Sequence, residues 1–208
     1  YVETKYFLQI SPDINFKFEE LKLFVNLAKI LDDKFAAIGP RFKNVNESSH
    51  KQIKKNLKYG AINSIHGSFM FINKKKFYEI GGFDDNFFLY FEETEFCYRA
   101  KKKGFLSYQI NIAEVTTDGR SVEINDTQEE NRISNILIWH FIWSSFYFNK
   151  LKFGRNISVL IFIPLFIRII LRLTFYLIVN DKKKLEKYRF RLSGLISSIL
   201  EKKSSLRP

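Results

Sequence analysis

Short apolar runs alternate with helical periods along the first part of the chain. Residues 5–10 (KYFLQI) and 34–39 (KFAAIG) predict buried strands. Between them, residues 17–31 place apolar side chains at helical spacing. Residues 11–13 (SPD) end the first strand, because proline cannot continue a central strand. Strands that alternate with helices in this way predict an α/β sheet.

The middle of the chain continues the same alternation. Residues 40–59 are polar and predict a long surface loop. Residues 62–72 predict a strand interrupted by Gly67, and residues 74–80 predict a short helix closed by Gly81 and Gly82. Two strand-like runs then follow, over 105–110 and 112–121, with a glycine turn in the second. The strands among these segments continue the α/β pattern of the first part of the chain.

A segment rich in aromatic and acidic residues, GGFDDNFFLYFEETEFCYR, stands between these elements at residues 81–99. Two adjacent carboxylates, Glu92 and Glu93, open a predicted helix whose apolar residues Phe96, Cys97 and Ala100 follow one and two turns beyond Glu93. Glu93 therefore lies at the N-terminal end of the buried stripe. The helix dipole favours an ionised carboxylate there, which is how a general base would be placed.

The C-terminal part has a different pattern. Residues 127–149 predict an aromatic-rich helix, and residues 157–179 form a 23-residue apolar run that is long enough to span a bilayer. Arg168 and Arg172 argue against a simple span, since each costs about 2.5–3.5 kcal/mol at mid-membrane. Three placements stay open: a helix in the membrane plane, a true span, and a helix buried in protein. Residues 182–200 predict an amphipathic helix that Gly194 weakens.

Composition and charge divide the chain in the same place. The 208 residues, 46% of them hydrophobic, suffice for one domain with a core and an appendage. Residues 1–149 hold 20 Lys and Arg against 19 Asp and Glu, whereas residues 150–208 hold 14 against 3. The excess positive charge predicts an anionic partner, and the absence of a groove-reading motif favours a membrane surface over nucleic acid. The single cysteine, Cys97, excludes an internal disulfide framework.

The stretch GGFDDNFFLYFEETEFCYRAKKKGF resembles the C-terminal half of the catalytic domain of family 2 glycosyltransferases. Within that family it most resembles bacterial rhamnosyltransferase-like members that build surface polysaccharides. The matching positions are Gly67, Gly81–Asp85, Phe87–Phe88, Glu92–Glu93, Glu95 and Arg99. The stretch FLQISPDI is similar to the family strand that ends in Asn-Pro-Asp, with Ser11 in place of Asn. The resemblance implies a GT-A type Rossmann-like fold.

The resemblance also implies roles for individual residues. Glu93, as the second member of the acidic pair, is the expected general base, and Glu92 stays an alternative because the family more often has Asp at this position. Asp13 falls on the aspartate of the acidic motif and is the expected ligand of Mg²⁺ or Mn²⁺, which oxygen ligands suit. Four further positions are expected to bind substrate: Gly67, Asp84, Asp85 and Arg120.

Two departures from the family pattern limit this expectation. Thr116 stands where members often carry a histidine that contributes to the metal site, so Asp118 would have to help there. The nucleotide-binding strands that precede the Asp13 strand in the family are absent, and the chain begins with Tyr1, so we expect an N-terminal portion to precede it. Residues 1–126 then form a partial GT-A domain, and residues 127–208 form a helical, membrane-associated extension.

Each candidate also has a simpler interpretation. Asp13 could cap the helix over 15–31 instead of binding a metal. Glu95 and Arg99 most simply form an ion pair on the helix surface. His66 could line the acceptor cleft, but a histidine in a strand more often has only a structural role with its hydrogen bonds satisfied. Cys97 is expected in the core.

The sequence thus predicts an inverting glycosyltransferase at the cytoplasmic face of the inner membrane. It would use a nucleotide-sugar donor, with rhamnose as one candidate sugar, and a glycan or lipid-linked acceptor in cell-envelope polysaccharide synthesis. The alternative is a catalytically incomplete, membrane-associated scaffold or partner subunit, because donor-binding strands and the family histidine are lacking. The expected partners include an anionic membrane surface and exclude nucleic acid.

Overall fold

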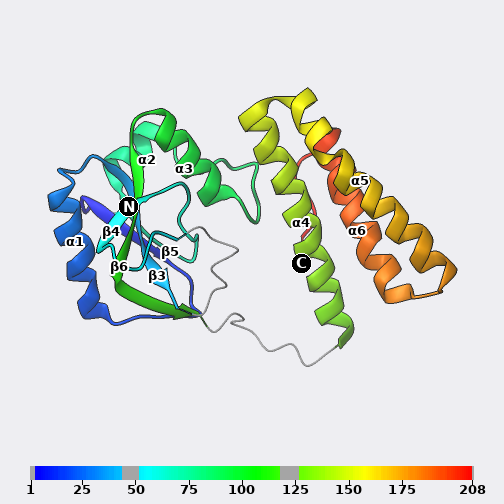
Figure 1. The fold of residues 1–208 in the computed structure, drawn as a ribbon, viewed down its shortest axis with the longest axis horizontal. Coiled ribbons are helices and arrows are strands. Elements are labelled where there is room, and N and C mark those ends of the chain that lie inside the picture. The colour runs from blue at the N-terminus through cyan, green and yellow to red at the C-terminus, as the bar shows by residue number, and fades with distance from the viewer. Residues whose placement is uncertain (1–2, 44–51, 118–126, 208) are drawn as a thin grey trace. The chain divides into compact units, whose positions relative to one another are not determined.

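The computed structural model describes residues 3–43, 52–117 and 127–207, and the chain folds as two compact units. One unit combines Tyr1–Asp84 with Glu92–Glu123 and contains the sheet. The other combines Asp85–Phe91 with Ile124–Pro208 and contains the long C-terminal helices (Figure 1). A mixed α/β sheet followed by helices agrees with the α/β class and the helical tail that the sequence predicts.

The elements follow one another in an order close to the predicted one. The strands are β1 (Tyr6–Ile10), β2 (Ile14–Asn15), β3 (Phe35–Phe42), β4 (Tyr59–Ile62), β5 (Phe69–Asn73) and β6 (Leu106–Thr117). The helices are the 3-10 turn η1 (Phe18–Glu20), α1 (Leu21–Ile30), α2 (Lys74–Ile80), α3 (Glu92–Lys102), α4 (Thr127–Phe153), α5 (Arg155–Ile178) and α6 (Lys182–Ile199).

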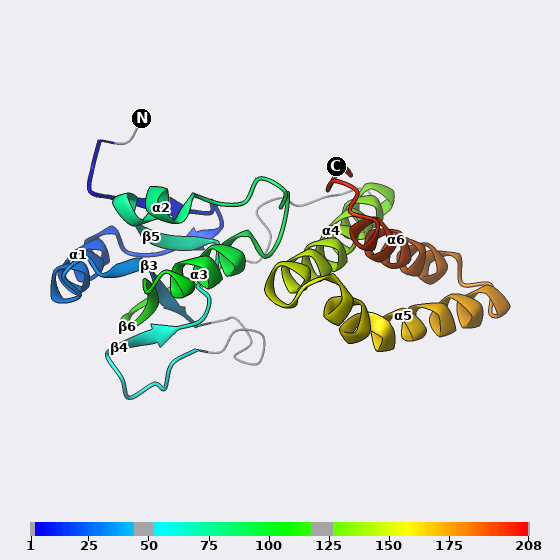
Figure 2. The ribbon, with the colours of Figure 1, turned by 90° about the horizontal axis from the view of Figure 1, so that it is seen from above.

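Within the described residues the sheet has six strands in the order β1-β5-β3-β6-β2, and β4 also pairs with β6. Only β3 and β6 pair in parallel there, and the other pairs are antiparallel. Helix α1 covers one face of the sheet, while α2 and α3 cover the other (Figure 2). Strand β5 is buried on both faces, because Phe69 and Phe71 pack in the α1 core and Met70 and Ile72 in the α2–α3 core.

The predicted helix over 74–80 is confirmed to the residue as α2. Gly81 closes it in the left-handed region (φ 101°), and its N–H donates to the carbonyl oxygen of Phe77. Asn73 caps the other end by accepting a hydrogen bond from the N–H of Lys76 at 3.2 Å. The strand at 5–10 and the helices over 17–31, 157–179 and 182–200 are likewise present, with ends that shift by a few residues.

Three predictions in the middle of the chain are wrong. The two strands predicted over 105–110 and 112–121 are one, since β6 runs without a break from Leu106 to Thr117. The polar loop does not begin at residue 40, since β3 continues through Pro40 to Phe42 with every residue buried. The single strand over 62–72 is two strands, because β4 pairs with β6 whereas β5 lies between β1 and β3. Residues 63–68 form the turn that carries the chain from one to the other. This turn brings Gly67 to the site described below.

The helical unit has its own core where α4, α5 and α6 meet. Phe146, Phe162 and Leu195, one from each helix, are buried there. Gly194 does more than weaken α6, because a Cβ built on it would lie 2.7 Å from the carbonyl oxygen of Trp139. Only glycine therefore allows α4 and α6 to approach this closely.

The segment Asp85–Phe91 packs on α4 within the helical unit. The ring of Phe87 lies 5.0 Å from that of Tyr147, and the ring of Phe88 lies 5.1 Å from that of His140. Ser144 Oγ donates a 2.7 Å hydrogen bond to the carbonyl oxygen of Leu89. The aromatic run that the sequence shows before the acidic pair therefore serves packing.

Candidate active site

Glu93 stands in the first turn of α3. Tyr90 (φ 65°) and Phe91 (φ 71°) directly precede this helix in the left-handed region, which bulky residues rarely adopt. The backbone therefore turns sharply before Glu92 opens the helix. Phe96, Cys97 and Ala100 are fully or almost fully buried and fix α3 against the sheet, as the sequence predicts.

The carboxylate of Glu93 faces the turn between β4 and β5. A Cβ built on Gly67 would lie 3.5 Å from Glu93 Cγ and 3.6 Å from Oε2, so the backbone of Gly67 lies directly beside this carboxylate. Thr94 Oγ1 lies 3.0 Å from Glu93 Oε1 and 2.9 Å from Ser64 Oγ. The structure thus joins Ser64, Thr94 and Glu93 in a chain of hydrogen bonds, and it brings the predicted Gly67 and Glu93 together.

Burial and a neighbouring charge raise the pKa of Glu93 to about 7, from an ordinary value of 4.5. Desolvation is the larger cause, and the Glu92 carboxylate adds repulsion. The hydrogen bond from Thr94 opposes both but does not cancel them. A carboxylate with a pKa near neutrality can exchange a proton with a substrate at physiological pH.

Glu92 lies beside it in a different environment. Burial also raises the pKa of Glu92, and its Oε2 atom is buried with no hydrogen-bond partner among the described residues. Among the described residues, Glu92 has no chain of hydrogen bonds like the one that runs from Ser64 through Thr94 to Glu93. The choice of Glu93 over Glu92 as the base stays a prediction, and these contacts favour it.

Asp13 lies in the turn between β1 and β2. Thr117 Oγ1, at the end of β6, donates a 2.5 Å hydrogen bond to Asp13 Oδ2. Beside it, Thr116 pairs with Asn15 in the β2–β6 ladder. Thr116, where the resemblance would place a histidine, therefore pairs with a residue two positions after Asp13. The interpretation of Asp13 as a helix cap is wrong, because Lys17 and Glu20 occupy the N-cap positions of η1 and α1.

The turn at residues 63–68 connects the two candidate carboxylates. Ser11 N–H, two residues before Asp13, donates to the carbonyl oxygen of Ser68 at 2.8 Å. Gln9 Nε2 donates to the carbonyl oxygen of Gly67 at 3.1 Å. The end of β1, which leads to Asp13, is therefore hydrogen-bonded to the same turn that lies beside Glu93.

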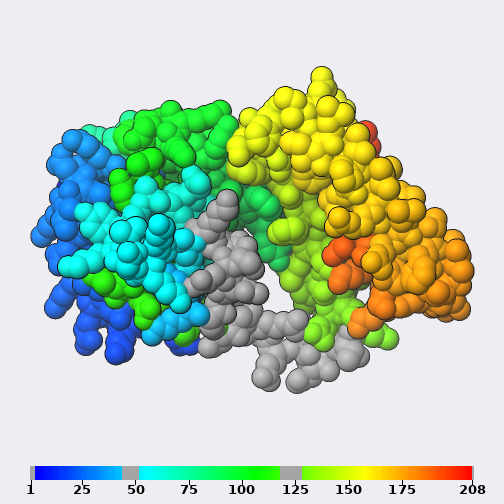
Figure 3. Space-filling view, viewed as in Figure 1, coloured from blue at the N-terminus to red at the C-terminus, as the bar shows by residue number. Residues whose placement is uncertain are grey.

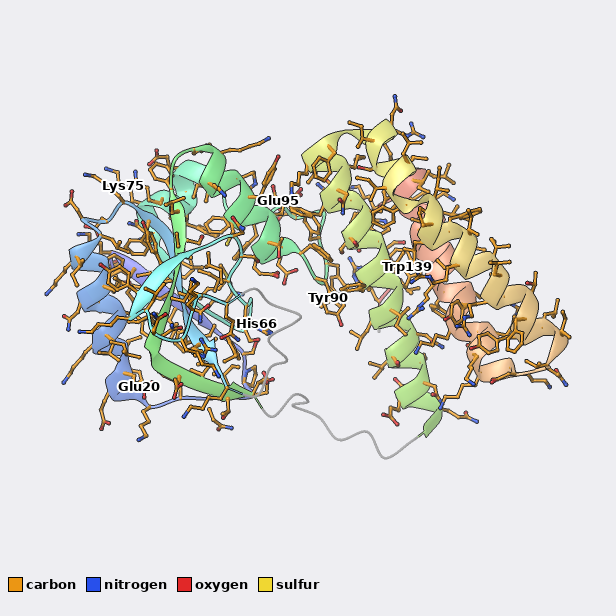
Figure 4. The ribbon with its side chains drawn as sticks, viewed as in Figure 1. Glu20, His66, Lys75, Tyr90, Glu95 and Trp139 are labelled. Carbon is orange, nitrogen blue, oxygen red and sulfur yellow. The ribbon has the colours of Figure 1, made fainter. Side chains whose placement is uncertain are left out.

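His66 lies in this turn and not in a strand (Figure 4). Its Nδ1 lies 3.3 Å from the backbone nitrogen and 2.5 Å from the Oγ of Ser68. The ring lies 4.5 Å from that of Phe42. Both residues line a cavity of about 20 Å³, together with Gly39, Pro40, Gln52, Ile62, Ser64, Ile65 and Gln109. This volume holds about one water molecule, so the cavity is too small for a sugar.

Asp13 can supply only part of a metal site. Within residues 3–43, 52–117 and 127–207 no group of three or more His, Cys, Asp or Glu side chains could hold a metal ion. A divalent cation on Asp13 would take most ligands from water and from a bound diphosphate, as Mg²⁺ commonly does. Asp118, the predicted helper, and Arg120 lie outside the described residues.

The remaining predicted residues fall at the border of the two compact units. Asp84 is partly buried and ends the first segment of the sheet unit, whereas Asp85 is exposed and opens the segment that packs with the helical unit. Their assignment to substrate binding stays a prediction.

Glu95 and Arg99 do pair, but the expectation of a surface pair is wrong. The side chain of Glu95 is 4% exposed, and Arg99 binds it through Nε at 2.5 Å and Nη2 at 2.7 Å. The same guanidinium donates to the carbonyl oxygens of Ile80 at 2.8 Å and Gly82 at 2.6 Å. This pair ties the end of α2 and the Gly-Gly turn to α3, the helix that carries Glu95 (labelled in Figure 4). The pair has a structural role in α3, the helix that also carries the candidate base.

A buried polar network beside the cavity was missed in the sequence. Arg41, Gln109 and Asn111 are 6%, 3% and 9% exposed, and Asn111 Oδ1 accepts from Gln109 Nε2 at 2.9 Å. Asn111 Nδ2 donates to the carbonyl oxygens of Lys54 and Leu57, which fixes the segment that leads into β4. The signal was the pair of amides at 109 and 111, on the same face of one strand.

Comparison with known proteins gives one distant relationship. The chain is 28% identical over 127 residues to the low-salt glycan biosynthesis hexosyltransferase Agl10 of Haloferax volcanii. The similarity covers 51% of this chain and 40% of that protein, so the chain spans well under half the length of this relative. No family model matches the chain. The relationship supports glycosyltransferase ancestry and leaves the family unassigned.

Proposed function

We propose that this chain carries the acceptor side of an inverting glycosyltransferase of the GT-A type, related to family 2. The distant similarity to a hexosyltransferase of glycan biosynthesis supports sugar transfer. The donor would be a nucleotide sugar, with rhamnose one candidate, and the acceptor a glycan or a lipid-linked sugar in envelope polysaccharide synthesis.

One observation carries the proposal: a mostly buried carboxylate with a pKa near 7 that lies beside the glycine of the β4–β5 turn. Glu93 has this pKa because it is buried next to Glu92, and Gly67, which has no side chain, lies beside its Oε2. An acceptor hydroxyl must lose its proton as its oxygen attacks the anomeric carbon. Glu93 Oε2 can accept that proton, and a single displacement inverts the anomeric configuration.

The hydrogen-bonded neighbours of Glu93 would orient it for this step. Thr94 Oγ1 holds Oε1, so Oε2 is the oxygen that faces Gly67. Ser64 in turn holds Thr94. We assign Thr94 and Ser64 as positioning residues, since they act on the substrate only through Glu93.

Asp13 would hold the divalent cation, Mg²⁺ or Mn²⁺. A bound cation neutralises the leaving diphosphate. The hydrogen bond from Thr117 keeps Asp13 Oδ2 in place, and Oδ1 is left for the cation or its water. The fit is partial, because the described residues supply this one carboxylate.

The test is nucleotide-sugar turnover with Mg²⁺ or Mn²⁺, measured for the protein as its gene encodes it. Glu93→Gln should lower transfer by about 10³-fold or more while donor binding is kept, and Asp13→Asn should weaken donor binding. Glu92→Gln is the matched control, with a loss of less than about tenfold. Equal transfer by the Glu93→Gln variant and the wild type would remove the proposed base.

A further inference from the structure

Helix α5 buries only one narrow stripe in the helical unit. Ser158, Phe162, Ile169 and Tyr176 are buried, and they recur every four to seven residues along one side. Phe162 and Ile169 join the core with α4 and α6. Among the described residues of its own unit, no element covers the opposite side of this apolar helix.

Large apolar side chains line that opposite side. Leu160, Ile167, Leu171 and Ile178 are 64%, 51%, 64% and 82% exposed. Their spacing of seven, four and seven residues places them on one line along the helix. Figure 3 shows the surface of α5, yellow to orange, open to solvent. A continuous apolar surface of this length marks an interaction site.

Two arginines stand at the edge of this stripe. Arg168 and Arg172 are one turn apart and, at 3.6 residues per turn, roughly 80 to 120° around the helix from the stripe. They line a shallow groove with Pro164, Ile167, Leu171 and Phe175. Arg172 Nη1 contacts Tyr176 Oη at 3.4 Å, and no described carboxylate pairs with either arginine. The groove therefore combines cations with apolar walls.

We propose that the exposed side of α5 lies in the plane of an anionic membrane surface. The stripe of Leu160, Ile167, Leu171 and Ile178 enters the boundary between headgroups and acyl chains, and the two arginines contact the lipid phosphates. A helix with an apolar face edged by basic residues binds membranes in this way. Lys182 and Lys183, exposed just after α5, add to the attraction.

This placement fits the charges better than the alternatives do. Helix α5 is long and apolar enough to cross a bilayer by length and composition. A span would, however, carry Arg168 to the middle of the hydrocarbon, where it cannot reach a headgroup. Residues 150–208 hold 14 basic and 3 acidic residues. A second copy of the chain on the same stripe would bring two such positively charged surfaces together, and they would repel one another.

Co-sedimentation of the full 208-residue chain with lipid vesicles tests the proposal. Vesicles of phosphatidylcholine mixed with phosphatidylglycerol should bind the chain at least tenfold more tightly than pure phosphatidylcholine. Arg168→Glu with Arg172→Glu should weaken this binding by about 30-fold or more. The control Lys22→Glu with Lys75→Glu makes the same change in net charge at two exposed helix starts of the sheet unit and should keep most of the binding.

A second pair of variants tests the apolar stripe. Leu171→Asn should weaken vesicle binding by about tenfold. Ile30→Asn, at a position on α1 that is 66% exposed, should leave binding unchanged. Circular dichroism of each variant reports whether the helices are kept. Equal losses in the two variants, or none in Leu171→Asn, would overturn the assignment of the stripe.

Depth measurements distinguish a helix in the membrane plane from a span. Cysteine introduced at Leu160, Ile167 or Ile178 can carry a fluorophore, because burial raises the pKa of the native Cys97 thiol to about 11 and leaves it unreactive at neutral pH. Similar shallow depths at all three positions are expected. A deep label at Ile167 between shallow labels at the other two would show a span. A dimer on vesicle-free gel filtration that Leu171→Asn dissolves would show a second copy on the stripe. Either result overturns the proposal.

Discussion

Replacement of Glu93 by glutamine should make the protein more stable at neutral pH while it abolishes transfer. Folding takes the Glu93 carboxyl from water into a site where desolvation and the Glu92 charge oppose ionisation. Glutamine has nearly the same shape and no charge, so it avoids this opposition. The hydrogen bond from Thr94 to Oε1 can still form to the amide oxygen.

The size and pH range of the effect follow from the pKa of Glu93. It rises from 4.5 in the unfolded chain to about 7 in the folded one. Since one pKa unit corresponds to about 1.4 kcal/mol, the ionised group lowers the free energy of unfolding by about 3 kcal/mol. When folding raises the pKa of a carboxyl group, the group does not lower the free energy of unfolding at a pH below its unfolded pKa. This free energy is then lost as the pH rises from 4.5 to about 7. The glutamine variant should equal the wild type near pH 4 and exceed it by about 3 kcal/mol near pH 8.

Urea denaturation from about pH 4 to about pH 8 measures this difference directly. Glu79→Gln is a control of opposite sign, because its partner Lys76 lowers the pKa of Glu79, so this variant should gain nothing at alkaline pH. A free energy of unfolding for Glu93→Gln that follows the wild type at every pH would refute the reasoning. It would mean that Glu93 ionises without penalty, and the argument for a base tuned to neutral pH would fail with it.

Four further variants test the packing of the two compact units. Arg99→Ala should lower the free energy of unfolding by about 3–5 kcal/mol, because it leaves Glu95 buried without its partner, and Arg99→Lys should recover only part of this in the same urea titration. Gly67→Ala should keep the stability within about 0.5 kcal/mol, since the new methyl meets Glu93 at an ordinary 3.5 Å, while transfer falls roughly tenfold because the carboxylate is covered. Gly194→Ala should cost about 1–3 kcal/mol, because its Cβ would lie 2.7 Å from the Trp139 carbonyl oxygen.

The elements that local rules determine were predictable from the sequence. Helix α2 begins after Asn73, which caps it, and ends at Gly81 in the left-handed region, so both ends are encoded by single residues. Helix α3 has its apolar residues at helical spacing after Glu93. In each case the decisive contacts join residues no more than about one turn apart.

What the sequence could not supply depends on contacts across the chain. The pairing of β4 with β6 and of β5 with β1 and β3 joins segments far apart, so residues 62–72 resembled a single strand. The contact of Gly67 with Glu93 and the hydrogen bond of Thr117 to Asp13 also join residues that are far apart in the sequence. Local patterns therefore could not predict them. The resemblance to glycosyltransferases named Gly67, Glu93 and Asp13 without showing which residues they contact.

Two buried carboxylates on one helix show how a structural acid differs from a candidate catalytic one. Glu95 has its charge met by the two nitrogens of Arg99, and that guanidinium continues to two backbone carbonyls, as a structural role requires. Glu93, half a turn earlier, has a threonine hydroxyl and no cation among the described residues, and it faces a second carboxylate. Such an arrangement lowers stability at neutral pH and has no structural benefit. A buried carboxylate with a raised pKa and no cation partner among the described residues is what the proposed proton transfer requires, and that is why Glu93 and not Glu95 is the residue to test.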